Sequence, residues 1–276
     1  MNKIQPRHAE AFIADRPSSK KVSIATVNKC IRTLRRIFNL AIVPRGYLAE
    51  GQNPFAKIKE RKTTENEMRY VKVEEYLSLM GKSTSIWWRA FLSIAYGSGL
   101  RRNEILHLTW KDIDFESRSI KVTAKKGTDD ILEWEPKNRK NRIVPMSDES
   151  TRLLADIQVK AQEGHPYVFI SPERLSRIKH RRGIRNWNST SETVNNLNRD
   201  FNVFRRRAGV HKCTLHDLRR SAITNWAGQL PIQVVQQHTG HSDISTTRKY
   251  YLAVRPEDVV SANKVLNDIL AKKQDD

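Results

Sequence analysis

The chain has 276 residues, enough for one large or two ordinary domains, so it can bury a core without disulfide or metal staples and is not a stapled mini-protein. Lysine and arginine total 50 against 30 aspartate and glutamate, and the formal net charge of +20 exceeds what solubility requires. A well-solvated surface is the simpler interpretation, but an excess of this size predicts a polyanionic partner, with nucleic acid as the first candidate.

The cysteine content and the hydropathy pattern predict where the protein works. Cys30 and Cys213 are the two cysteines of the chain, too few for the disulfide framework of a secreted domain. No stretch approaches the roughly 18 uncharged apolar residues of a membrane span, and the first thirty residues carry charges throughout. We therefore expect a cytoplasmic protein without a membrane partner, and the excess of positive charge adds the expectation that it is nucleoid-associated.

The amino-terminal region predicts a small helical domain. Apolar residues recur at intervals of three and four from Ser23 to Ile42, which indicates an amphipathic helix. Residues 57–67 have almost no apolar content, as in an exposed linker, so we place the domain boundary near Lys62. The first domain is then residues 1–62, followed by a linker at 63–67. The other face of the helix carries four basic residues that can attract phosphate: Lys29, Arg32, Arg35 and Arg36.

The second domain, residues 68–276, is predicted to be mainly α with a small β-sheet, an α+β fold. Alternating apolar residues predict strands at 119–123 and 142–146, and residues 131–134 give a further candidate strand. Thr214 and Asp217 match the start of a capping box, and Gly240 is expected to end a helix that begins near Pro231. Further helices are predicted at 70–80, 86–96 with breaks at Gly97 and Gly99, 103–108, 151–161, 193–208 and 217–227.

Four short segments of this domain stand out together. They are Gly99–Glu104 (GLRRNE), Lys137–Pro145 (KNRKNRIVP), His216–Arg219 (HDLR) and Thr239–His241 (TGH), with Tyr250 nine residues after His241. In this order they resemble the tyrosine recombinases, the phage integrase family, over about 210 residues from Met68 to the end. Each segment alone is a weak signal, but four in the family's order and at its intervals are hard to obtain by chance.

These residue types suit the chemistry of a phosphodiester. Displacing a DNA strand with a protein nucleophile concentrates negative charge on the nonbridging oxygens, and preorganised guanidiniums such as Arg101 and Arg219 stabilise that charge. A tyrosine hydroxyl with a pKa of about 10 needs a base or cationic neighbours to become a nucleophile. The leaving 5′ oxygen needs a proton, which a lysine on a turn between strands can deliver.

The resemblance assigns the individual roles. It implies that Tyr250 is the nucleophile, that His216 is an acid or base in contact with the phosphate, and that His241 donates a hydrogen bond to that phosphate. It places the lysine five positions before the Arg-x-x-Pro strand, and Lys137 stands five before Arg142. Because a phosphotyrosine keeps the energy of the broken bond, the resemblance implies no metal and no other cofactor. It also implies double-stranded DNA as the partner, a homotetramer on paired sites, and no small-molecule substrate.

Several assignments have competitors. Arg102 adjoins Arg101, Tyr251 follows Tyr250, and Lys126 and Lys140 are alternatives to Lys137. A zinc site is a further interpretation, because Cys213-x-x-His216 and His238-x-x-His241 have plausible ligand spacing. The zinc interpretation would leave Arg219, Gly240 and Tyr250 without a role.

The resemblance also raises expectations about assembly. An apolar helical stripe follows Tyr250, and it consists of Val259, Ala262, Leu266, Ile269 and Leu270. In the family such a terminal helix docks into a neighbouring protomer, although packing on its own domain is equally consistent with the pattern. Compared with the four-helix core-binding domain of the family, the amino-terminal domain looks shortened.

The predicted function is a site-specific recombinase, with a non-catalytic DNA-binding regulator or a type IB topoisomerase as alternatives.

Overall fold

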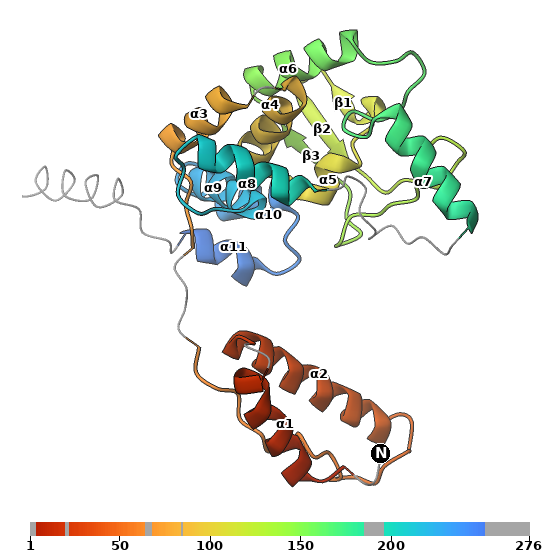
Figure 1. Cartoon of the computed structure of the whole chain (residues 1–276), viewed down its shortest axis with the longest axis vertical. Helices are drawn as coiled ribbons and strands as arrows, with labels where there is room; N and C mark the ends of the chain where they lie inside the picture. Colours follow the sequence, from red (N-terminus) through yellow and green to blue (C-terminus); the bar gives the residue numbers. More distant parts are fainter. Residues whose placement is uncertain (1–3, 20–21, 64–67, 84, 185–195, 252–276) are drawn as a thin grey trace, which may run out of the picture. The chain divides into compact units, whose positions relative to one another are not determined.

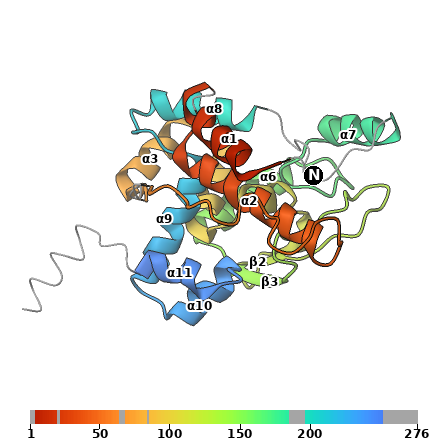
Figure 2. The ribbon, with the colours of Figure 1, turned by 90° about the horizontal axis from the view of Figure 1, so that it is seen from below.

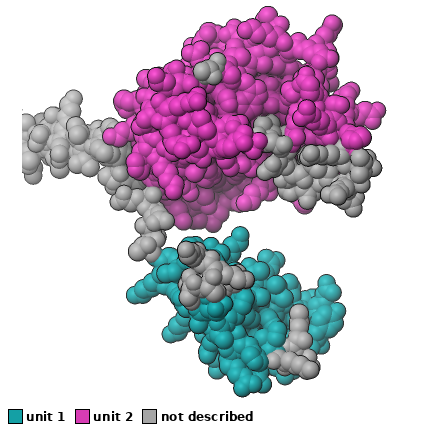
Figure 3. Space-filling model, viewed as in Figure 1, with its two compact units in different colours: residues 1–67 teal, residues 68–276 magenta. Residues whose placement is uncertain are grey.

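The computed structural model describes residues 4–19, 22–63, 68–83, 85–184 and 196–251. The chain forms two compact units, residues 1–67 and residues 68–276 (Figure 3). None of the helices in the described ranges has both the length and the apolar character that crossing a bilayer requires.

The small unit is built on two helices, α1 (Pro6–Ser19) and α2 (Ile24–Ile42) (Figure 1). Ser23 caps α2, because its Oγ accepts a hydrogen bond from the backbone N–H of Thr26 at 3.3 Å. The returning chain adds Phe55, whose ring lies 5.6 Å from that of Phe38. The buried residues between these elements are Ala9, Ile13, Val27, Ile31, Phe38, Ala41, Leu48 and Phe55.

The basic face of α2 is only partly free. Arg35 donates through Nε to the carbonyl of Phe55 at 3.1 Å and through Nη2 to the carbonyl of Ile58 at 2.6 Å. Two of the three donor nitrogens of Arg35 are therefore engaged by carbonyl groups of the returning chain, which leaves fewer of its donors for a phosphate than the sequence pattern predicts. Lys29 and Arg36 are exposed.

The large unit is mainly helical with one small sheet, which confirms the predicted fold class (Figure 1). Its described elements run from α3 to the helix that carries Tyr250. They are α3 (Val73–Lys82), α4 (Ile86–Ser93), the π-helix η1 (Ile94–Ser98), α5 (Arg102–Leu106), the 3-10 helix η2 (Trp110–Asp112), β1 (Ile113–Asp114), β2 (Ser119–Val122), β3 (Arg142–Pro145), α6 (Asp148–Val159), α7 (Pro172–Ile184), α8 (Leu197–Arg207), α9 (Leu215–Ala227), α10 (Ile232–Thr239) and α11 (Ile244–Tyr251).

The sheet has the strand order β1-β2-β3, and both pairs are antiparallel. Ile120 pairs with Val144 in β3, and both side chains are completely buried in the core. The candidate strand at 131–134 is not a strand of this sheet, since Trp134 forms only an isolated bridge with Lys125. The third strand is instead β1, whose two residues are too few to show an alternating pattern in the sequence.

The helix predicted at 86–96 contains a change of helix type. α4 ends at Ser93, and the chain continues as η1 to Ser98, so Gly97 lies inside a helix and does not break one. Gly99 does end it, with a φ of 57° in the left-handed region that glycine adopts readily. A Cβ on Gly99 would lie 3.4 Å from the Ala222 side chain on α9, so η1 and α9 pack closely at this point.

The last helices of the described part of this unit lie together. α10 and α11 both pack on α9, and α10 also contacts β3 (Figure 2). The sheet and the carboxyl-terminal helices therefore meet where Arg142 begins β3 and Gly240 ends α10.

Aromatic packing around α4 is expected to determine the stability of the large unit. Phe91 is fully buried and stacks on Trp87 with ring centroids 5.3 Å apart. Phe91→Ala should lower the free energy of unfolding by about 3–5 kcal/mol in urea denaturation, because it leaves a cavity among rings that cannot collapse. Val159→Ala is the control, since Val159 is 86% exposed and its truncation should change stability by less than about 0.5 kcal/mol. An unchanged unfolding midpoint for Phe91→Ala would contradict this.

Candidate active site

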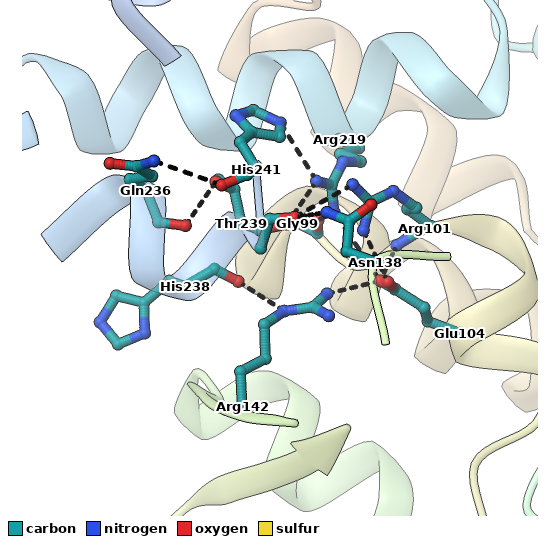
Figure 4. A network of polar contacts seen from close by, with 11 residues as sticks. Gly99, Arg101, Glu104, Asn138, Arg142, Arg219, Gln236, His238, Thr239 and His241 are labelled. Atoms are coloured by element: carbon teal, nitrogen blue, oxygen red, sulfur yellow. Dashed lines mark hydrogen bonds and ion pairs between the residues drawn. The ribbon is translucent and has the colours of Figure 1, made fainter. Parts of the chain in front are cut away.

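One buried carboxylate, that of Glu104, gathers arginines from three separate segments (Figure 4). Its Oε1 lies 2.8 Å from Nη1 of Arg101, which precedes α5. Its Oε2 lies 2.6 Å from Nη2 of Arg142 on β3 and 3.8 Å from Nη1 of Arg219 on α9. The same carboxylate accepts the backbone N–H of Arg101 at 2.7 Å and so caps α5.

The charge of this cluster is unbalanced in favour of the cations. Burial alone would raise the pKa of Glu104, but the charge of Arg142 and its hydrogen bond, with the charges of Arg219 and Arg101, lower that pKa below its ordinary value. One carboxylate against three guanidiniums leaves two positive charges uncompensated. The cluster is therefore suited to hold an anion.

The end of α10 contributes a second set of acceptors. The carbonyl of Thr239 accepts from Nη2 of Arg219 at 2.8 Å, and the carbonyl of His238 accepts from Nε of Arg142 at 2.9 Å. The carboxyl end of a helix carries partial negative charge, which favours cations there. Gly240 ends α10 with a φ of 63°, as predicted, and a Cβ at this position would lie 3.2 Å from the guanidinium of Arg142.

A pocket of about 660 Å³ opens beside the cluster. Its lining includes Arg101, Arg219, His216 and Lys137, so the structure brings together four of the six residues that the sequence singled out. Of the three candidate lysines, Lys137 lines the pocket. Lys126 and Lys140 are exposed and do not line it, and Arg102 lines its exposed edge.

His216 is held at the pocket by the start of α9. Thr214 accepts from the N–H of Asp217 at 3.3 Å, and Asp217 accepts from the N–H of Thr214 at 2.8 Å, which is the predicted capping box. Although His216 reaches the surface, the protein around its ring lowers its pKa, and the charges of Arg220 and Arg219 lower it further. The ring is therefore neutral at neutral pH.

The ring of His241 contacts the guanidinium of Arg219. Nε2 of His241 is 3.4 Å from Nη2 of Arg219, and Nδ1 is 2.9 Å from Oγ1 of Thr247. A guanidinium can only donate, so Nε2 is the acceptor and the proton of this imidazole resides on Nδ1. Burial, followed by the charges of Arg219 and Arg101, lowers the pKa of His241 to about 4.

Tyr250 completes the group of six predicted residues. Its ring stacks on that of His241, with centroids 5.9 Å apart and planes 17° from parallel. Only 8% of Tyr250 is exposed, and it packs with Ile223 and Val235. The competing Tyr251 donates its hydroxyl to the carbonyl of Leu230 at 2.5 Å.

No role was predicted for Glu104 or for the guanidinium of Arg142, although both residues stand in the quoted motifs. The available signal for Glu104 was a charged residue directly before the mostly apolar run Ile105–Leu108. A second buried ion pair, 2.9 Å between Nζ of Lys125 and Oδ2 of Asp112, has no signal in the sequence, because its partners lie on separate segments.

Neither the zinc site nor the apolar stripe after Tyr250 finds support in the described residues. Across the described ranges no three His, Cys, Asp or Glu side chains form a group that could hold a metal ion, so the residues of the zinc interpretation do not converge. The apolar stripe at 259–270 lies outside the described residues.

Removing the charge of Glu104 should destabilise the large unit. Glu104→Gln leaves three buried or half-buried guanidiniums without their common counterion, so the free energy of unfolding should fall by about 3–5 kcal/mol. Urea denaturation followed by circular dichroism measures this. Glu116→Gln, at an exposed position, is the control. The role of Glu104 as the common counterion of the three arginines is refuted if both variants unfold at the same urea concentration as the parent.

The low pKa of His241 makes stability depend on pH. Between about pH 4 and the ordinary value of 6.5, the unfolded chain binds a proton that folded His241 does not, so stability should rise with pH through this window. His241→Gln removes this contribution and should flatten the rise in unfolding midpoint, whereas replacement of the exposed His211 by Gln should leave it unchanged. If the unfolding midpoint rises equally with pH in His241→Gln and in the parent, the lowered pKa of His241 is refuted.

Comparison with known proteins identifies the family. A model of the phage integrase family matches residues 66–257. The XerC-like tyrosine recombinase of Caldanaerobacter subterraneus subsp. tengcongensis is 26% identical over 264 residues, which cover 90% of this chain and 67% of that protein. The tyrosine recombinase XerA of Pyrococcus furiosus is 25% identical over 249 residues, which cover 88% of this chain and 75% of that protein.

Solved structures show the same fold. The Tn1549 transposon integrase in complex with transposon right end DNA has a TM-score of 0.68 at 21% identity, covering 96% of this chain and 86% of that one. A lambda integrase dimer bound to a COC′ core site has a TM-score of 0.63 at 18% identity, covering 91% of this chain and 65% of that one. Because the family match spans most of the chain and includes every residue of the site described above, this protein belongs to the phage integrase family of tyrosine recombinases.

Proposed function

We propose that this protein cleaves DNA with Tyr250 and holds the broken strand as a 3′-phosphotyrosine until it is rejoined. The observation that carries the proposal is the juxtaposition of an uncompensated arginine cluster with the stacked pair of His241 and Tyr250. That the similar integrase structures were solved with transposon or core-site DNA supports DNA as the substrate.

The arginines have different tasks in this proposal. The side chain of Arg101 is 24% exposed and lines the pocket, so its guanidinium is available to a nonbridging oxygen. Arg219 is buried but lines the pocket, and its contacts to the carbonyl groups of Gly99 and Thr239 fix its orientation before DNA arrives. Arg142 is also buried, does not line the pocket, and faces Glu104 and α10, which suits a structural task.

Cleavage forms one bond and breaks another. The hydroxyl oxygen of Tyr250 attacks phosphorus, the bond from phosphorus to the 5′ oxygen breaks, and Lys137 supplies the proton that the leaving oxygen takes up. Neutral His216 can accept the proton of the tyrosine. Rejoining reverses these steps, so the cycle consumes no nucleotide.

His241 responds to the arrival of the phosphate. In the free protein its Nε2 accepts from Arg219. A phosphate that draws the donors of Arg219 to itself frees Nε2, and the nearby anion raises the pKa of His241 toward a form that donates. His241 then acts as the hydrogen-bond donor to phosphate that the family resemblance implies.

The proposal extends to the partners of the chain. The small unit would contact duplex DNA through exposed basic residues such as Lys29 and Arg36. Four copies would act on two paired sites, and the dimeric assembly of lambda integrase on its core site supports action as an oligomer. Acting on DNA, the protein would work at the nucleoid in the cytoplasm.

Covalent capture tests the nucleophile. The purified protein is mixed with a DNA fragment library and quenched in denaturant, and the DNA that stays attached to protein is sequenced. Tyr250→Phe should abolish the adduct while DNA affinity, measured by fluorescence anisotropy, stays within about twofold, because a single hydroxyl is lost. Tyr251→Phe is the matched control and should retain the adduct.

The outcomes separate the competing functions. An adduct in Tyr250→Phe would move the nucleophile to another residue. Binding without any adduct in the parent would favour a non-catalytic DNA-binding regulator. An adduct accompanied by relaxation of supercoiled DNA, without pairing of two sites, would favour topoisomerase chemistry.

A further inference from the structure

The segment that carries Lys137 is fastened to the end of α10 by two side chains. Asn138 donates a hydrogen bond from Nδ2 to the carbonyl of Gly240, and Arg142 donates from Nε to the carbonyl of His238 at 2.9 Å (Figure 4). Both acceptors lie in the last helical turn of α10 and its cap, residues 238–240, which directly precede His241 and form what we call the turn of His241. The lysine segment and the turn of His241 are therefore held together by contacts that do not involve the side chain of Lys137 or of His241.

The two ends of this segment are also fixed. At one end the indole of Trp134 stacks on His107, with ring centroids 5.1 Å apart and planes 15° from parallel. At the other end Arg142 is buried against Glu104. Asn138 provides the fastening in the middle of the segment, one residue from Lys137.

Besides the contacts of Asn138 and Arg142, the polar contacts of residues 134–142 do not fasten this segment to α10, and the next contact to α10 is that of the Ile143 carbonyl with Nδ1 of His238 at 3.2 Å. Arg139 pairs with Glu135 at 3.1 Å inside the same loop, and both side chains are exposed, so this pair adds little. Asn141 accepts from the backbone N–H of Ala124 at 3.4 Å, at the base of the loop. The contact of Asn138 is thus distinct from both.

A proton donor on a long side chain depends on its backbone. A lysine ammonium sits on a flexible stem that can adopt many rotamers, and Lys137 is exposed. Proton transfer needs donor and acceptor within about 3 Å, so a shift of the backbone removes the donor from reach. Consecutive Cα atoms are about 3.8 Å apart, so a contact at Asn138 limits that shift directly.

We propose that Asn138 is a positioning residue for strand cleavage. Its amide holds the segment of Lys137 against the turn of His241, so that the proton donor and the phosphate-binding residues keep a fixed separation. Asn138 acts through Lys137 and not on the DNA. The inference rests on the proposed role of Lys137 as the general acid.

The test uses a leaving group that needs no proton. The duplex recovered by covalent capture is synthesised in its ordinary form and with sulfur in place of the bridging 5′ oxygen at the cleaved phosphate. A thiol has a pKa of about 8.5, so sulfur departs as the thiolate. The single-turnover cleavage rate is measured for the parent, Lys137→Ala, Asn138→Ala and the matched control Asn141→Ala.

Asn138→Ala should cleave the ordinary duplex about 10- to 100-fold more slowly and the sulfur duplex at close to the parent rate. Lys137→Ala should show the same pattern with a larger defect, and Asn141→Ala should cleave both duplexes at close to the parent rate. DNA affinity and the thermal midpoint of Asn138→Ala should match the parent. Rescue by sulfur distinguishes positioning of the donor from a structural defect, which would slow both reactions equally.

Each contrary result has a separate meaning. Equal slowing of Asn138→Ala on both duplexes, or no slowing on either, overturns the role of Asn138 alone if Lys137→Ala is rescued by sulfur. A Lys137→Ala variant that is slow on both duplexes refutes the proposed general acid, and the inference about Asn138 falls with it.

Discussion

The site depends on the buried carboxylate of Glu104. Arginines from three segments could not approach one another without a shared counterion, because like charges at such distances repel strongly where water is excluded. Glu104 supplies that counterion and also caps α5, so a single side chain fixes both the helix start and the charge cluster. The remaining positive charge is what a phosphate can use.

The end of α10 is the second constraint. Helix termini leave carbonyl groups without partners inside the helix, and here cationic and amide side chains satisfy them. The arrangement favours Gly240, because its φ of 63° lies in the left-handed region and a Cβ there would lie only 3.2 Å from the guanidinium of Arg142. Local backbone geometry and long-range electrostatics therefore select the same residue.

Much of the local structure follows from sequence patterns. The capping box of Thr214 and Asp217 and the helix stop at Gly240 were predicted from residue type and spacing, because capping is a local interaction. The third strand of the sheet and the π-helix at 94–98 were not predicted. A two-residue strand shows no alternation, and a change of helix type leaves the apolar pattern nearly intact.

The sequence by itself determined the fold class and the residue types that a phosphodiester requires, because periodicity, caps and motif spacing are written in neighbouring residues. Tertiary structure decided which side chains meet. It gave Glu104 its two distant partners Arg142 and Arg219, turned Arg35 inward, placed Lys137 on the pocket, and joined Asn138 to Gly240 across 102 positions of sequence. These contacts depend on how distant segments pack, and a linear pattern carries no signal for such packing.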